Sequence, residues 1–162
     1  MKKLLLILLC VPLIGLGQDV NERILLIKEM YKETNELLNK SGQSCKEIEE
    51  VEYDIPGDKY SRPYIKTIKY CNLDKGYSRI TYEYQGDHYY EYEEYYFRYN
   101  TLYFSYRVNS DGPDDIKYRQ YFNTDGELIR NLVDYGNGNK NIDSAPFLYH
   151  LHYSQELLLD DK

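Results

Sequence analysis

The segment from His88 to Tyr99 reads HYYEYEEYYFRY. It places seven aromatic side chains and three carboxylates in twelve residues. Tyrosine has a high strand propensity, and it combines an apolar ring with a polar hydroxyl, so it suits either face of a sheet. A second alternating segment follows in residues 102–108. Together the two segments predict an antiparallel β-hairpin.

Cross-strand pairs of apolar side chains set the expected register of this hairpin. A tight turn at Asn100–Thr101 would place Phe97 opposite Phe104 and Tyr95 opposite Tyr106. One face would then carry Tyr95, Phe97, Tyr99, Leu102, Phe104, Tyr106 and Val108.

The first half of the stretch is out of phase with the second. Tyr90 and Tyr92 look like inward-facing residues, but they do not share the parity of Tyr95. One extra residue near Glu93–Glu94, a β-bulge, would reconcile the two halves. This register directs Tyr96 away from the apolar face.

Further strands are expected on both sides of the hairpin. Upstream, residues 48–53, 64–71 and 80–84 show period-two patterns separated by turn residues. Downstream, residues 116–122 and 128–133 flank Asn123–Gly126, a turn in which Gly126 suits positive φ. Residues 136–141 are expected to form a loop.

Helices are expected at both ends of the mature chain. Asp19 and Glu22 fit a capping box. Apolar residues then recur every three or four positions, which is one stripe of an amphipathic helix ending near Gly42. The stripe consists of Val20, Ile24, Ile27, Tyr31, Thr34 and Leu38. A short last helix should begin at Pro146, with Ser144 as its cap.

The order of these elements predicts an α+β domain. The N-terminal helix packs on one face of a five- to six-stranded antiparallel meander sheet, and a short C-terminal helix follows. The opposite face of the sheet is expected to lie in water, as antiparallel sheets allow.

The first seventeen residues have the anatomy of a signal peptide. Lys2 and Lys3 precede an apolar run from Leu4 to Ile14, and small residues at Gly15 and Gly17 predict cleavage after Gly17. A retained anchor or a lipidated Cys10 are the alternatives. Residues 18–162 would form one domain in the periplasm or outside the cell, with no further membrane contact.

The composition is acidic. The formal net charge is −7, and removing Lys2 and Lys3 makes it −9. Such a chain repels nucleic acid, so the sequence predicts no nucleic-acid partner. Cys45 and Cys71 remain after cleavage, and in an oxidising compartment they are expected to form a disulfide, worth about 3 kcal/mol by chain entropy. A metal or redox pair is the alternative.

Two resemblances appear in these residues. The segment from Tyr121 to Ile129, YFNTDGELI, resembles the hairpin of tyrosine-aspartate (YD/RHS-type) repeats, although only one copy is present. Residues 77–133 resemble small exported bacterial proteins of unknown function that have a helix followed by a Tyr-rich meander. These resemblances imply a fold and no activity.

Three groups of residues could carry catalytic or metal-binding chemistry. Glu91 and Glu93 share one side of a strand and could serve glycoside hydrolysis, but the expected reading is a solvated face. His88, His150 and His152 do not make up a zinc ligand set. Residues 109–115 could offer oxygen ligands to Ca²⁺ but lack the EF-hand order. We therefore expect no enzyme, no metal and no cofactor.

Exposed tyrosine with arginine is favourable interface chemistry, and it defines the expected partner-binding surface. The candidate residues are Tyr89, Tyr96, Arg98, Tyr103, Arg107 and Tyr121. The sequence thus predicts an exported, non-catalytic binding domain of the bacterial cell envelope, with a protein or small-molecule partner. The alternatives are an acidic inhibitor or immunity-like protein that neutralises a basic secreted enzyme, and a hydrolase using Glu91 and Glu93.

Overall fold

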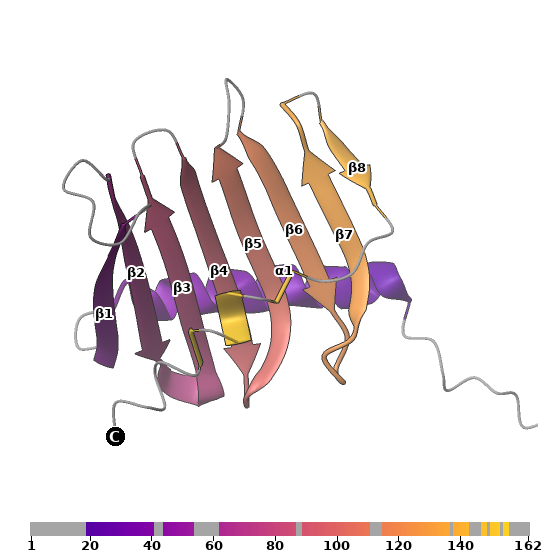
Figure 1. Cartoon of the computed structure of the whole chain (residues 1–162). Coiled ribbons are helices and arrows are strands. Elements are labelled where there is room, and N and C mark those ends of the chain that lie inside the picture. Colours follow the sequence, from indigo (N-terminus) through magenta and orange to yellow (C-terminus); the bar gives the residue numbers. More distant parts are fainter. Residues whose placement is uncertain are drawn as a thin grey trace, which may run out of the picture.

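A computed structural model describes residues 19–40, 44–53, 62–86, 89–110, 115–136, 138–142, 147–148, 150–152 and 154–155. It is an α+β fold, as expected, in which a meander sheet follows an N-terminal helix (Figure 1). Eight antiparallel strands lie in the order β1 to β8, more than the five or six expected. The strands are β1 Ser44–Tyr53, β2 Pro63–Asn72, β3 Tyr77–Gln85, β4 Tyr90–Arg98, β5 Thr101–Ser110, β6 Ile116–Phe122, β7 Leu128–Asp134 and β8 Asn139–Asn141. The short β8 lies where a loop was expected.

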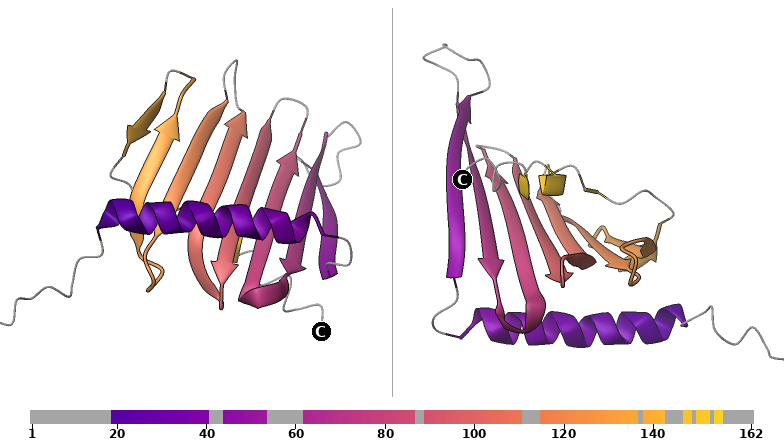
Figure 2. Two further views of the ribbon diagram at one scale, coloured as in Figure 1. Left: turned by 180° about the vertical axis from the view of Figure 1, so that it is seen from behind. Right: turned by 90° about the horizontal axis from the view of Figure 1, so that it is seen from below.

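The helix α1, Val20–Leu38, runs across the strands on one face of the sheet (Figure 2). Within the predicted stripe Ile24, Ile27 and Thr34 are buried, whereas Val20 and Tyr31 remain exposed. Asp19 caps the helix by accepting from the backbone N–H of Asn21 at 3.0 Å, one residue earlier than the expected Glu22. The expected stop at Gly42 lies outside the described residues.

The hairpin of β4 and β5 differs from the expected register. Tyr99 and Asn100 both have positive φ (49° and 65°) and form the turn, so Arg98 pairs with Thr101. The bulge falls between Tyr96 and Phe97 and not at Glu93–Glu94. Because a shift of one residue exchanges the faces of a strand, Tyr96 now shares a face with Phe104.

Close backbone packing supports this turn. The backbone N–H of Tyr99 donates to the carbonyl of Gly76 at 2.7 Å. Gly76 has a φ of +74°, and a Cβ at this position would lie 2.3 Å from a ring carbon of Tyr99. Only glycine combines this backbone conformation with so close an approach of the ring.

Both faces of the sheet carry a core. On the helix face, α1 covers a cluster that includes Ile27, Tyr96 and Tyr121. On the opposite face, called the second face below, Leu148 and Leu151 of the C-terminal segment pack on a separate cluster. Residues 150–152 and 154–155 are helical and lie across the sheet from α1 (Figure 2). The expectation of a wholly solvated second face was therefore wrong.

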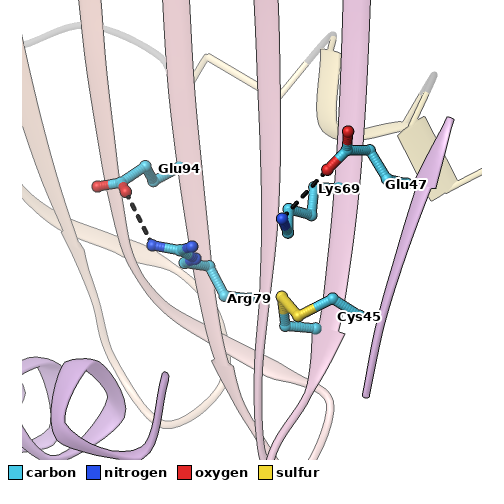
Figure 3. The surroundings of a disulfide bond; sticks show 6 residues. Cys45, Glu47, Lys69, Arg79 and Glu94 are labelled. Atoms are coloured by element: carbon cyan, nitrogen blue, oxygen red, sulfur yellow. Dashed lines mark hydrogen bonds and ion pairs between the residues drawn. A yellow bond between two sulfur atoms is a disulfide. The ribbon is translucent and has the colours of Figure 1, made fainter. Parts of the chain in front are cut away.

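The predicted disulfide is confirmed. Cys45 and Cys71 are bonded and lie directly opposite one another on β1 and β2. Beside them lie the ion pairs Lys69–Glu47 (3.1 Å) and Arg79–Glu94 (3.2 Å) (Figure 3). The disulfide is compatible with a periplasmic or secreted protein.

The signal-peptide prediction falls on residues outside the described part, as do His88 and most of the expected Ca²⁺-binding loop. Within the described ranges, no helix has the length and apolar character needed to cross a membrane.

Candidate functional site

The six tyrosines and arginines expected to form a partner-binding surface do not share one. Tyr96 and Tyr103 were expected on an outer face, and this was wrong, because they are 0% and 1% exposed beneath α1. The Tyr96 ring meets the Tyr31 ring edge-on with centroids 5.1 Å apart. The Tyr103 hydroxyl lies 2.7 Å from the hydroxyl of Thr34. The misplaced bulge accounts for both errors.

The remaining four candidates are divided between the two faces. Tyr121 belongs to the helix-side core and is only 5% exposed. The guanidinium of Arg98 lies 5.2 Å from the centroid of the Tyr77 ring, at the rim of that core. Tyr89 and Arg107 lie on the second face, near Glu91. The six candidate residues therefore do not form one continuous surface.

The helix face instead contains a groove with the same chemistry. Its volume is about 420 Å³, and it lies between α1 and strands β5 and β6. We call it the α1 groove; its apolar lining comes from Ile27, Tyr31, Phe104, Tyr106 and Tyr121. Lys28 and Arg119 supply its charge. Tyr121 is the one predicted candidate that the groove contains.

The rings of the groove support one another. Tyr31 packs edge-on against Phe104 with centroids 5.3 Å apart, and Phe104 lies 5.2 Å from Tyr121 at a tilt of 54°. Tyr31 remains 38% exposed, although the sequence placed it in the buried stripe of the helix. Tyr31 also lines the groove.

Arg119, one of the two charged residues of the groove, contacts uncharged side chains. Arg119 donates to the side-chain oxygen of Asn139 at 2.8 Å, and its guanidinium lies 5.7 Å from the centroid of the Tyr106 ring. A neutral amide orients the guanidinium without neutralising it. Within the described part of the chain, neither Arg119 nor Lys28 has an ion pair.

Sequence reasoning missed the groove for identifiable reasons. It named neither Lys28 nor Arg119 as a candidate binding residue. Tyr106 was expected on the apolar face of its strand, but no pattern in the sequence placed Arg119 beside it. Only the register of β5 with β6, in which Tyr106 pairs with Arg119, brings them together.

A buried ionic network occupies the second face. The side chains of Glu91 and Glu93 are 5% and 3% exposed, and both form ion pairs with Arg107. The Nδ1 atom of His150 lies 3.2 Å from Glu93 and 3.9 Å from Glu91. His150 thus joins the C-terminal segment to strand β4. The expectation that Glu91 and Glu93 lie on a solvated face was wrong.

Tyrosine hydroxyls complete the network. Tyr89 donates to Glu91 at 2.8 Å, and Tyr95 donates to Glu93. The His150 ring stacks on Tyr82, with centroids 4.2 Å apart and an angle of 6°. Each carboxylate therefore has a cationic partner and a hydroxyl donor, as buried charges require.

The two carboxylates of the hydrolase alternative already have partners within the protein. A general acid must hold a proton at neutral pH, which requires surroundings that disfavour the charged form. Around Glu91 and Glu93 the structure instead places the guanidinium of Arg107 and the hydroxyls of Tyr89 and Tyr95. We interpret the network as a link between the C-terminal segment and strand β4, formed through His150.

The same side chains form the one metal-like cluster found in the described residues. One ligand atom each from Glu91, Glu93 and His150 lies within 4.8 Å of the others. However, Arg107 contacts both carboxylates and already supplies the positive charge. A metal ion would have to displace this guanidinium, so the cluster is better explained as an ion-pair network.

Buried tyrosines have perturbed acidity on both faces. Burial, together with a hydrogen bond to Glu33 or Glu91, raises the pKa of Tyr77 and of Tyr89 to about 12. Burial also raises the pKa of Tyr106 and of Tyr121. Their hydroxyls therefore remain protonated, and can donate hydrogen bonds, at neutral pH.

We predict that the protein loses stability in alkaline solution. Because the folded pKa values are raised, the stabilisation is complete below about pH 10, where the tyrosines of the unfolded chain begin to ionise. It is lost as the pH rises towards the folded values near 12. Urea unfolding at stepped pH, with tyrosinate absorbance recorded in parallel, measures the effect. Tyr77→Phe should reduce the slope, and stability that stays constant over this interval would contradict the prediction.

No protein family model, curated protein or solved structure matches the chain.

Proposed function

We propose that the protein is an exported, non-catalytic binding domain that holds a small organic anion with a flat apolar body in the α1 groove. The observation that supports this proposal best is the character of the polar groups that line the groove. Lys28, Arg119 and the hydroxyls of Tyr31, Tyr106 and Tyr121 can all donate a hydrogen bond. A complementary ligand must therefore supply acceptors and negative charge.

The aromatic lining determines the rest of the ligand. Tyr31, Phe104 and Tyr121 present ring faces and edges, which suit a planar ring or a short acyl chain. The volume of about 420 Å³ is within the range of small-molecule sites. An aromatic or acyl carboxylate, sulfonate or sulfate would meet both requirements.

The charge of the whole chain makes the groove selective. With a net charge of −7, the protein repels anions over most of its surface. Lys28 and Arg119, which have no ion pair among the described residues, make the groove locally positive next to its aromatic rings. They favour an anion small enough to be contacted by both cations while its apolar part lies on the rings.

A matched pair of dyes tests the proposal. Anilinonaphthalene sulfonate is an aromatic anion, and phenylnaphthylamine is the same skeleton without the sulfonate. We expect the anion to bind at least about tenfold more tightly, because a charge-assisted hydrogen bond to Arg119 or Lys28 is worth that much. Fluorescence titration of the folded protein, with circular dichroism to confirm folding, measures the ratio.

Single-charge variants locate the dye. Arg119→Gln and Lys28→Gln should each weaken binding of the anion by about five- to tenfold and leave the neutral dye unaffected. Lys32→Gln is the control, because Lys32 is an exposed lysine on the same helix that pairs with Glu36 at 3.9 Å. Equal affinity for the two dyes, or an equal loss in the Lys32 variant, would overturn the proposed site.

A further inference from the structure

The second face contains a separate pocket, next to the ionic network, with a volume of about 340 Å³. Three tyrosine rings line it, from Tyr82, Tyr84 and Tyr89. Its charged groups are Glu52, Lys66 and Glu91, and His150 of the C-terminal segment also borders it. We propose that this pocket binds a small organic cation, an amine or a quaternary ammonium, independently of the α1 groove.

The tyrosine rings form a corner that suits a cation. Tyr84 and Tyr89 meet edge-on, with centroids 5.7 Å apart and an interplanar angle of 69°, so two walls of the pocket are nearly perpendicular. The face of an aromatic ring carries negative quadrupolar charge and attracts ammonium groups within about 6 Å. Perpendicular rings allow one cation to contact both.

Neighbouring rings hold these walls in place. Tyr84 stacks on Tyr64 with centroids 5.0 Å apart and an angle of 11°. Tyr82 stacks in the same way on His150. A pocket whose rings are already ordered loses little conformational entropy when it binds a ligand.

The charges next to the corner favour a cation as well. The carboxylate of Glu91 is buried, and the hydroxyl of Tyr89 donates to it at 2.8 Å. Lys66 pairs with Glu52 at 2.7 Å, and Arg107 pairs with both Glu91 and Glu93. Among the acidic and basic side chains that line the pocket, the carboxylates of Glu52 and Glu91 outnumber the single lysine, Lys66.

The two sites are proposed to bind ligands of opposite charge because their lining residues carry opposite charges. The α1 groove contains two cations and no carboxylate, whereas the second-face pocket contains two carboxylates and one paired lysine. An anion in the second-face pocket would lie near the carboxylate of Glu91, and repulsion between like charges is unfavourable. An ammonium group there is attracted by the rings and by the carboxylate together.

Choline and dimethylbutanol, its uncharged carbon isostere, test the inference on the unmodified protein. The two molecules have nearly the same shape, so the ratio of their affinities reports the charge alone. We expect choline to bind about five- to tenfold more tightly and to shift the ring resonances of Tyr84 and Tyr89 in NMR titrations. Equal binding of the two, or choline binding that leaves these resonances unmoved, would overturn the proposal.

Substitutions at Tyr89 separate the ring from its hydroxyl. Tyr89→Leu should weaken choline binding about fivefold, whereas Tyr89→Phe keeps the aromatic wall and should retain most of the affinity. Tyr135→Leu is the control, because Tyr135 is exposed and lies outside both sites. If Tyr89→Leu binds choline as well as Tyr135→Leu does, the corner is not the site.

Discussion

Replacing Tyr96 with alanine is expected to lower the free energy of unfolding by about 3–5 kcal/mol, the usual cost of truncating a buried aromatic residue. The ring is 0% exposed and packs between Tyr31 on the helix and Phe104 on the neighbouring strand. Its removal would leave a cavity between α1 and the sheet that rigid neighbours cannot fill. Urea unfolding followed by circular dichroism measures the loss.

A matched tyrosine controls for the change of residue type. Tyr53 lies on the edge strand β1 and is 50% exposed, so Tyr53→Ala should cost less than about 1 kcal/mol. If Tyr96→Ala is equally mild, Tyr96 faces water and the register inferred from the sequence alone is correct.

The expected and observed registers of β4 with β5 differ, although other features of the fold were predicted correctly. The helix was predictable, because only one face of an α-helix collects Ile24, Ile27 and Thr34. The disulfide was predictable from two cysteines in a chain with a signal-like start. The phase of the central hairpin was not, because Tyr95, Tyr96 and Phe97 are consecutive.

With aromatic residues at consecutive positions, either phase of the strand buries rings, so the hydrophobic pattern cannot select one. The turn selects it here. Tyr99 and Asn100 adopt positive φ, and Gly76 leaves room for the Tyr99 ring. A tyrosine in this conformation is uncommon. The sequence placed the turn one residue later, at Asn100–Thr101, because cross-strand apolar pairs and not the turn residues set the expected register.

The second face was unpredictable for a different reason. Glu91 and Glu93 were recognised as lying on one side of a strand, which is confirmed, but not as buried. Their burial depends on His150 and Leu151, which belong to a segment far along the chain. No periodicity in the sequence connects a central strand with the C-terminal segment that covers it.

Arg107→Met should be nearly as damaging as the loss of Tyr96, with an expected cost of about 3–5 kcal/mol at neutral pH. The substitution keeps most of the apolar stem but leaves the buried carboxylates of Glu91 and Glu93 without their guanidinium partner. Like charges would then face one another in a site from which water is largely excluded. The free energy of unfolding in urea measures this cost.

Two comparisons isolate the electrostatic cause. Arg119→Met removes the same side chain from the adjacent strand β6, where Arg119 faces an amide and no carboxylate, so it should cost less than about 1 kcal/mol. Adding Glu91→Gln and Glu93→Gln to Arg107→Met should recover most of the loss, because the remaining groups are neutral. Recovery would show that Arg107 acts by compensating buried charge. A triple variant as unstable as Arg107→Met would show that the loss does not come from uncompensated charge on these two carboxylates.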